Sequence, residues 1–202
     1  MKVVIVGAGS TAQDVASILL SDRNFQVVGF TDKDNKSKGK KILGIEVIGS
    51  HDLLRDLFAS GIHGAVVAIG YDNNLRERHF HRLREIGFEM VSAVHPSALI
   101  DRSAKIGDGV VISPGCIISP MVKIEQNTIL APGVIIGAET QIADNVYVGI
   151  GCNISGGTFI KRNAFLSAGC SVAPFVTVGK NSKIKPGASV VKNVPDKVRS
   201  KA

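Results

Sequence analysis

Tryptophan is absent from this 202-residue chain, and aromatic residues make up only 5% of it. Proteins that bind single-stranded nucleic acid combine positive charge with aromatic stacking platforms. The net charge of +7 therefore does not indicate nucleic acid by itself, and we expect no such partner. The charge fits either a solvated basic surface or a preference for ligands that carry phosphate groups.

Long apolar runs are also missing, since none approaches the roughly 18 residues that a membrane-spanning helix needs. We therefore expect no membrane partner. One lysine and a few apolar residues lead into a glycine-rich turn at the start, which predicts a core strand and not a signal peptide. The three cysteines, Cys116, Cys152 and Cys170, show no paired spacing, which argues against a disulfide framework and predicts a cytoplasmic location. We expect no metal cofactor.

A six-residue repeat fills the second half of the chain. In consecutive blocks of six from His95, the sixth residue is aliphatic in all sixteen blocks, without an insertion. These residues are Ile100, Ile106, Ile112, Ile118, Ile124, Leu130, Ile136, Ile142, Val148, Ile154, Ile160, Leu166, Val172, Val178, Ile184 and Val190. The fourth residue is always small or β-branched, and Gly and Asn cluster near the block starts, where a chain must turn.

Short strands with a turn every six residues are typical of a hexapeptide β-helix. Three blocks form one triangular coil, so sixteen blocks predict about five coils, or a prism ~25 Å long at a strand spacing of ~4.8 Å. The aliphatic column should point inward, with the small residues beside it. All three cysteines occupy the small position, so we expect packed, inert thiols.

The first 94 residues alternate between predicted strands and helices, which indicates a small parallel sheet with helices on both faces. We expect strands near 3–6, 25–30, 45–48, 65–69 and 90–94, and helices over about 12–20, 52–59 and 75–86. The segment 33–41, rich in Lys, Asp, Asn and Gly, predicts a loop that either is merely solvated or clamps a phosphate. We place the domain boundary between residues 94 and 95.

A glycine-rich turn, Gly7–Ala12, joins the first strand to the first helix. Glycine lets the backbone approach a phosphate, and a helix N-terminus supplies N–H donors. Asp32 follows the second strand, 23 residues after Gly9, where a ribose partner is expected. The turn is either a ligand-free connection or part of a nucleotide site, whose residues would be Gly9, Ser10, Thr11, Asp32, Ile69 and Gly70.

An α/β domain followed directly by a hexapeptide β-helix resembles the sugar acyltransferases of the sialic acid O-acetyltransferase type. This family includes bacterial N-acetyltransferases that act on UDP- or dTDP-linked 4-amino sugars. The resemblance covers nearly the whole chain and is carried by 4–9, 68–70, the junction 95–98, the β-helix and 187–193.

The resemblance implies a left-handed β-helix and a homotrimer with acetyl-CoA in the groove between neighbouring prisms. It also implies that the N-terminal domain binds a nucleotide sugar. The implied acetyl-CoA contacts are Tyr147, Ala168 and Pro186, with Lys161, Arg162, Lys183 and Lys185 as candidate phosphate partners. The implied product is an acetylated amino (or hydroxyl) group on a sugar used in surface glycan synthesis.

The sequence departs from the family at the general base. The family has a histidine followed by an acid, whereas this chain has Ala138 followed by Glu139, and no histidine occurs after His95. A methyl group cannot accept a proton. Three explanations stay open: the amine arrives deprotonated, another group such as Glu139, Asp144 or Tyr147 is the base, or Ala138 is an engineered or natural replacement. In addition, Thr11 stands where many relatives have histidine, and the segment after Pro195 is short.

Two further functions compete with acetyl transfer. Ala138 suggests a silent protein that binds nucleotide sugar or acetyl-CoA without turnover. The glycine turn with Asp32 suggests an NAD-linked oxidoreductase, although the β-helix supplies no domain for hydride chemistry. Of the five histidines, His95 is either a junction residue or a base, and the others are predicted to be surface residues: His51, His63, His79 and His81.

Overall fold

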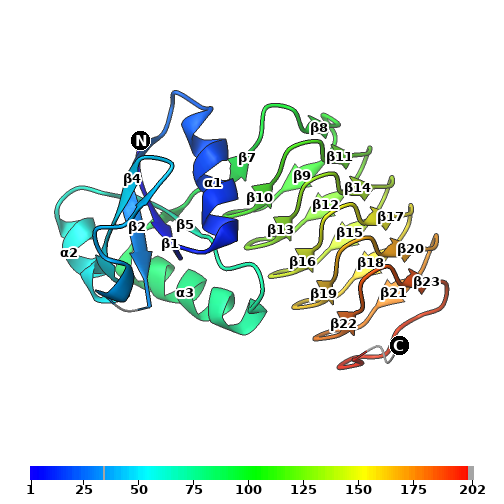
Figure 1. Cartoon of the computed structure of the whole chain (residues 1–202). Coiled ribbons are helices and arrows are strands. Elements are labelled where there is room, and N and C mark those ends of the chain that lie inside the picture. The colour runs from blue at the N-terminus through cyan, green and yellow to red at the C-terminus, as the bar shows by residue number, and fades with distance from the viewer. Residues whose placement is uncertain (34, 200–202) are drawn as a thin grey trace. The chain divides into compact units, whose positions relative to one another are not determined.

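The computed structural model describes residues 1–33 and 35–199. The chain forms two compact units, Met1–Ala93 and a second that begins at Val94. The first is an α/β domain and the second a left-handed parallel β-helix (Figure 1). No helix among the described residues has the length and apolar character needed to cross a membrane.

The first unit is built on a six-stranded sheet in the order β3-β4-β2-β1-β5-β6. Its elements are β1 (Lys2–Val6), α1 (Ser10–Leu20), β2 (Gln26–Asp32), a 3-10 turn (Asn35–Ser37), β3 (Lys41–Ile42), β4 (Ile45–Ser50), a 3-10 turn (His51–Leu53), α2 (Leu54–Ala59), β5 (Gly64–Val67), α3 (Asn73–Ile86) and β6 (Glu89–Met90). All of its pairings are parallel except that between β3 and β4.

The central strand β1 is apolar on both faces because helices cover both sides of the sheet. Val4 and Val6 pack in one cluster with Leu54 of α2 and Phe80 of α3. Side chains alternate along a strand, so the fully buried Val3 and Ile5 face the opposite side, which α1 covers (Figure 1). The predicted sheet with helices on both faces is confirmed.

Two details of this unit were not predicted. The described residues of 33–41 form a loop, as predicted, but the loop includes a 3-10 turn, and Lys41 begins β3, which forms a hairpin with β4. The single strand expected over 90–94 is two short strands, because β6 pairs with β5 whereas β7 (Ala93–Val94) joins a sheet of the β-helix. The pairing partners lie far away in the sequence, so a local pattern could not reveal them.

The second unit consists of two-residue strands in three stacked sheets. They are β7 (Ala93–Val94), β8 (Leu99–Ile100), β9 (Lys105–Ile106), β10 (Val111–Ile112), β11 (Ile117–Ile118), β12 (Lys123–Ile124), β13 (Ile129–Leu130), β14 (Ile135–Ile136), β15 (Gln141–Ile142), β16 (Tyr147–Val148), β17 (Asn153–Ile154), β18 (Phe159–Ile160), β19 (Phe165–Leu166), β20 (Ser171–Val172), β21 (Thr177–Val178), β22 (Lys183–Ile184) and β23 (Ser189–Val190). Each strand from β7 to β20 pairs with the third strand after it, as in Ile117 with Ile135 and Ile135 with Asn153, so one coil takes 18 residues.

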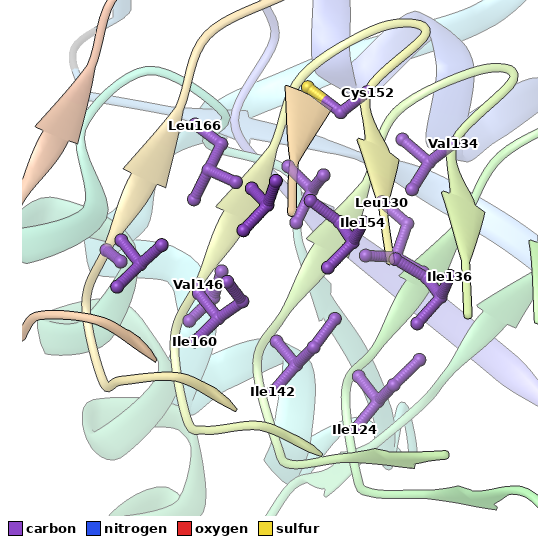
Figure 2. Packing of buried hydrophobic residues seen from close by; sticks show 14 of the residues in the cluster. Ile124, Leu130, Val134, Ile136, Ile142, Val146, Cys152, Ile154, Ile160 and Leu166 are labelled. Carbon is purple, nitrogen blue, oxygen red and sulfur yellow. The ribbon is translucent and has the colours of Figure 1, made fainter. Parts of the chain in front are cut away.

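The sixth residue of each block points into the prism, as predicted. Figure 2 shows Ile124, Ile142 and Ile160 of one sheet facing Ile136 and Ile154 of another across the interior. The cysteines are buried and free, also as predicted, and each thiol donates to a backbone carbonyl, for example that of Ser167 in the case of Cys152 (3.0 Å). Burial raises the pKa of Cys116, which keeps that thiol protonated.

The third residue of each block makes the turn. From Gly109 to Gly187 this position always has a positive φ, which favours Gly and Asn. One corner of the prism carries Asn at four successive coils, and their side-chain amides form a ladder: Asn127 to Asn145 (2.8 Å), Asn145 to Asn163 (2.8 Å) and Asn163 to Asn181 (2.6 Å). Another corner carries the only non-Gly, non-Asn residues of this kind between those limits, Met121, Glu139 and Phe175.

Candidate functional site

A cavity of about 330 Å³ lies in the first unit, at the carboxyl ends of β1, β2, β4 and β5. In open α/β sheets, ligands bind at this edge. All six residues predicted for the nucleotide site line it: Gly9, Ser10, Thr11, Asp32, Ile69 and Gly70. Gly7 and Ala8 of the same turn and Lys33 of the following loop line it as well. Sequence reasoning missed the rest of the lining, namely His51, Ala68, Tyr71, Asp72 and Leu75.

The glycine turn is held tightly against the strands beside it. Gly7 has φ +111° and donates to the carbonyl of Thr31 at 2.8 Å. A Cβ atom at Gly7 would lie 2.8 Å from the carbonyl oxygen of Ala68, so only glycine fits. Gly9 is the N-cap of α1 and no side chain caps this helix end. The N-terminal amides of α1 therefore border the cavity and can bind an anion such as a phosphate.

Asp32 ends β2 beside this turn, and its carboxylate accepts a hydrogen bond from the amide of Lys33 at 2.8 Å. The cavity thus combines helix amides, one lysine and two carboxylates, Asp32 and Asp72, of which Asp72 also accepts a hydrogen bond from Leu75 N at the start of α3. That donor set suits a phosphorylated ligand with hydroxyl groups. Within 1–33 and 35–199, no cluster of His, Cys, Asp or Glu could hold a metal ion.

A buried arginine, Arg76, holds the Ile69–Gly70 segment in place through hydrogen bonds to its carbonyls, and the sequence did not lead us to predict this role. Arg76 of α3 is fully buried, and its Nη1 donates to the carbonyls of Ile69 (3.0 Å) and Gly70 (3.3 Å) and to Oδ1 of Asn73 (2.9 Å). A sequence signal existed, because Arg76 lies four and seven residues before Phe80 and Leu83, on the apolar stripe of the helix. A charge at such a position indicates a buried, hydrogen-bonded side chain.

His51 was predicted to lie on the surface and does not: only 8% of it is exposed, and it lines the cavity. Its Nδ1 lies 3.0 Å from Oγ1 of Thr31, and its ring meets that of the half-buried His79 edge-on, with centroids 4.4 Å apart. Burial lowers the pKa of His51 to about 4, helped by His79, so the ring is neutral near pH 7. The sequence missed this residue because helix α3, which supplies His79, is distant along the chain. His63 and His81 are exposed, as predicted.

The predicted catalytic pair lies on the β-helix, in the turn between β14 and β15. Ala138 and Glu139 are both exposed, and Glu139 has φ +60°. Backbone hydrogen bonds fix the turn between its neighbours: Glu139 N donates to Pro120 O (3.0 Å), and Gly157 N donates to Ala138 O (2.9 Å). These hydrogen bonds fix the backbone at residue 138, but the side chain of Ala138 is a methyl group and can transfer no proton. His95 belongs to the first turn, where its Nδ1 accepts a hydrogen bond from Ser97 N (3.1 Å).

The predicted acetyl-CoA contacts lie on three successive coils. Tyr147 of β16 stacks on Phe165 of β19, with centroids 4.7 Å apart and planes 11° apart, and Lys183 Nζ lies 5.9 Å from the Phe165 centroid. Ala168 accepts a hydrogen bond from the amide of Gly187, which follows Pro186 one coil later (2.9 Å).

The candidate phosphate partners near these contacts are not equivalent. Lys161 forms an exposed ion pair with Asp196 at 3.4 Å, whereas Lys183 and Lys185 belong to the coil after Phe165 and Ala168. A second cavity, of about 290 Å³, lies near the end of the prism beside Ile184, Val190 and Val198, and none of the predicted contacts lines it.

Known proteins resemble this chain in both units. Residues 2–83 match the PglD N-terminal domain family. PerB from Caulobacter crescentus, solved in complex with CoA and GDP-perosamine, is 31% identical over 97% of this chain and 91% of that chain, with a TM-score of 0.91. A variant of this GDP-perosamine N-acetyltransferase with a histidine replaced by alanine, solved with the same two ligands, is 30% identical over 98% and 91%, with a TM-score of 0.82.

A more distant structure is the acetyltransferase domain of PglB from Neisseria gonorrhoeae in complex with acetyl coenzyme A. It is 25% identical over 97% of this chain and 93% of that chain, with a TM-score of 0.65. A comparison with curated proteins gives no match.

Proposed function

This chain belongs to the hexapeptide-repeat sugar acetyltransferases that share the PglD-type N-terminal domain, and we propose that it transfers acetyl from acetyl-CoA to the amino group of a nucleotide-linked sugar. The supporting observation is the pairing of the two units in one chain, a phosphate-type cavity at a sheet edge and an uninterrupted β-helix. Their order and length match those of PerB, which was solved with CoA and GDP-perosamine. The product would serve bacterial surface glycan synthesis.

In this proposal the cavity of the first unit holds the nucleotide sugar. The N-terminal amides of α1, at Ser10 and Thr11, bind the diphosphate, and Asp32 binds the ribose or the base. UDP and dTDP sugars were expected from the resemblance, but PerB binds a GDP sugar at 31% identity. We therefore rank a GDP-linked 4-amino sugar first and keep the UDP and dTDP sugars as alternatives.

Acetyl-CoA is proposed to bind along the second half of the β-helix, in the groove between neighbouring prisms of a homotrimer. Tyr147, Ala168 and Pro186 would contact it, with Lys183 and Lys185 close to its phosphates. The support is their arrangement on successive coils beside the Tyr147–Phe165 stack.

Ala138 supports a second candidate function, a protein that binds both ligands but turns over slowly or not at all. General base catalysis contributes about 10²–10⁴-fold, so a site without the base keeps only the rate that positioning provides. The alanine variant of the Caulobacter enzyme holds CoA and GDP-perosamine together, so loss of a histidine there leaves both ligands bound.

A single pair of measurements separates these candidates. Calorimetry gives the affinities for acetyl-CoA and for GDP-, UDP- and dTDP-linked 4-amino sugars, and transfer of labelled acetyl gives the turnover. Binding with turnover supports the enzyme, and binding without turnover supports the silent protein. Tight binding of NAD without any affinity for nucleotide sugars would contradict both.

A further inference from the structure

His51 occupies a special place in the cavity of the first unit. It follows the last residue of β4, is held through Nδ1 by the fully buried Thr31, and packs against His79. Among the described residues, no hydrogen bond to its other ring nitrogen, Nε2, is found. The ring is therefore fixed on one side and has hydrogen-bonding capacity left on the other.

The two histidines do not form a completed hydrogen-bond network. Nδ1 of His79 is buried and has no hydrogen-bond partner among the described residues. A buried polar atom without a partner costs stability, and native structures contain few of them. A cluster kept only for folding would satisfy this nitrogen or replace it with an apolar atom, so the arrangement is typical of a functional site.

The strand order shows which part of a ligand reaches His51. The glycine turn follows β1, Asp32 ends the adjacent β2, and His51 follows β4, the next strand outward. With strands ~4.8 Å apart, His51 lies ~10 Å across the edge from the turn that would bind the diphosphate. A nucleotide laid along this edge has its ribose near Asp32 and its base near His51.

The charge state of His51 fits an uncharged base. Burial lowers its pKa to about 4, with contributions from His79 and Arg82, while Asp32 and Asp52 act in the opposite direction. At pH 6–8 the ring is neutral, with one nitrogen that donates and one that accepts. Such a group suits the edge of a nucleobase, whereas a phosphate would favour a cation.

We propose that His51 is a specificity residue that recognises the nucleobase of the nucleotide sugar, through the ring nitrogen that Thr31 does not hold. The inference rests on the proposed function and adds to it the residue that distinguishes one nucleotide from another. Thr31 and His79 act as positioning residues, since they fix the plane of the ring.

Two isosteric variants test the role of each nitrogen. Asparagine places its amide near Nδ1, so His51→Asn keeps a partner for Thr31 and removes the outer group. Glutamine reaches the place of Nε2, so His51→Gln does the opposite. His81→Asn, on the exposed face of α3, is the matched control. Calorimetry with GDP, UDP, dTDP and inorganic pyrophosphate gives the affinities, and thermal unfolding checks that each variant is folded.

We expect H51N to weaken binding of the preferred nucleoside diphosphate by about 5–10-fold, the equivalent of one hydrogen bond. The affinities for GDP, UDP and dTDP should also differ less from one another than they do in the parent. H51Q should stay within about threefold of the parent. Pyrophosphate should bind all variants alike, and H81N should match the parent throughout. A folded H51N with parental affinity would overturn the inference, as would an equal loss for pyrophosphate.

A measurement on the parent protein avoids any folding defect of the variants. In ¹⁵N-labelled protein, the Nε2 resonance of His51 should shift when the preferred nucleoside diphosphate is added and should not shift with pyrophosphate. The absence of a shift on saturation with nucleotide rejects the role of His51. A parent that binds no nucleoside diphosphate and no nucleotide sugar refutes the proposed function itself, which distinguishes the two failures.

Discussion

At the scale of single residues, Ala138 is the departure from the family pattern that bears most directly on the proposed activity. The turn that carries Ala138 and Glu139 is fixed by backbone hydrogen bonds on both sides, so the scaffold for a base is intact. Glu139 follows Ala138 directly. An acid at this position would orient the imidazole of a preceding histidine, and it has no such role beside a methyl group. This favours loss of a histidine over a different mechanism.

Restoring the base is the first prediction. Ala138→His should raise the turnover number by roughly 10²-fold or more and change the Michaelis constants less, because a base acts chiefly in the transition state. The gained activity should fall as pH drops through the imidazole pKa, ordinarily ~6.5. Ala138→Gln is the control of comparable size without a base. A parent that already turns over at tens per second, an ordinary enzyme rate, would contradict the prediction.

His51 also makes stability depend on pH. Its pKa is about 4 when folded and 6.5 in the unfolded chain, so between these values the unfolded chain binds the extra proton. Stability should therefore fall by about 1–3 kcal/mol as pH decreases from 6.5 to 4, and the contribution should be constant above pH 6.5. Denaturant titrations at pH 7.5, 6.0 and 5.0 test this. His51→Gln should reduce the slope, and His79, whose pKa is lowered in the same direction, should account for part of the rest.

At the scale of elements, repetition replaces the individual helix or strand as the stabilising unit. A two-residue strand has no stability alone, but each strand of the inner coils pairs with the coil before it and the coil after it. The corner turns repeat as well, and their left-handed backbone is tolerated because Gly and Asn occupy most of them.

The asparagine ladder gives a prediction at this scale. Asn145 is 1% exposed, accepts from Asn127, donates to Asn163 and has φ +59°. Asn145→Ala should cost about 2–4 kcal/mol, since it loses both hydrogen bonds and replaces Asn, which tolerates the left-handed region, with Ala, which does not. Asn145→Gly keeps the backbone and should cost about 1 kcal/mol less. Urea denaturation measures both, and equal losses would show that the backbone conformation contributes nothing.

Charge on the late coils should determine CoA affinity. Lys183→Glu combined with Lys185→Glu should weaken CoA binding at least tenfold and reduce its dependence on salt, because the charges of two proposed phosphate partners become negative. Lys105→Glu with Lys123→Glu, on the first coils, is the matched control and should have little effect. If calorimetry at 50 and 300 mM salt finds all variants equal, these lysines only keep the prism soluble.

At the scale of the whole molecule, the prism has faces that one chain leaves uncovered. Leu99, Ile117 and Ile135 form an apolar column on the outer side of β8, β11 and β14, each at least 39% exposed. Exposed apolar columns on a flat face are typical of surfaces that another subunit covers.

We therefore expect a homotrimer in solution. Light scattering should give about three times the chain mass of 21.3 kDa at micromolar concentration. Ile117→Lys with Ile135→Lys should shift this mass toward the monomer, whereas Lys123→Gln, on another face, should not. A monomer mass for the parent would refute both the trimer and a CoA groove between subunits.

Much of this protein could be predicted from its sequence because the decisive signals are local or periodic. Sixteen aliphatic residues at a six-residue spacing specify the β-helix, since every block repeats the same short-range choice of strand and turn. The glycine turn and Asp32 likewise lie at standard distances within one strand–helix–strand unit. Its four predicted residues line one cavity together with Ile69 and Gly70, which follow β5.

What only the tertiary structure decided are contacts between segments far apart in the chain. From the sequence alone, His51 is interpreted as a surface residue. In the fold, Thr31 and His79, which are 20 and 28 positions away, pack against its ring. From the sequence, Arg76 is one of several charged residues in a helix. Only the fold shows that its guanidinium donates to the carbonyls of Ile69 and Gly70. Periodicity predicts which face of an element is buried. It does not predict which polar group will contact a buried side chain, because that depends on how the elements pack.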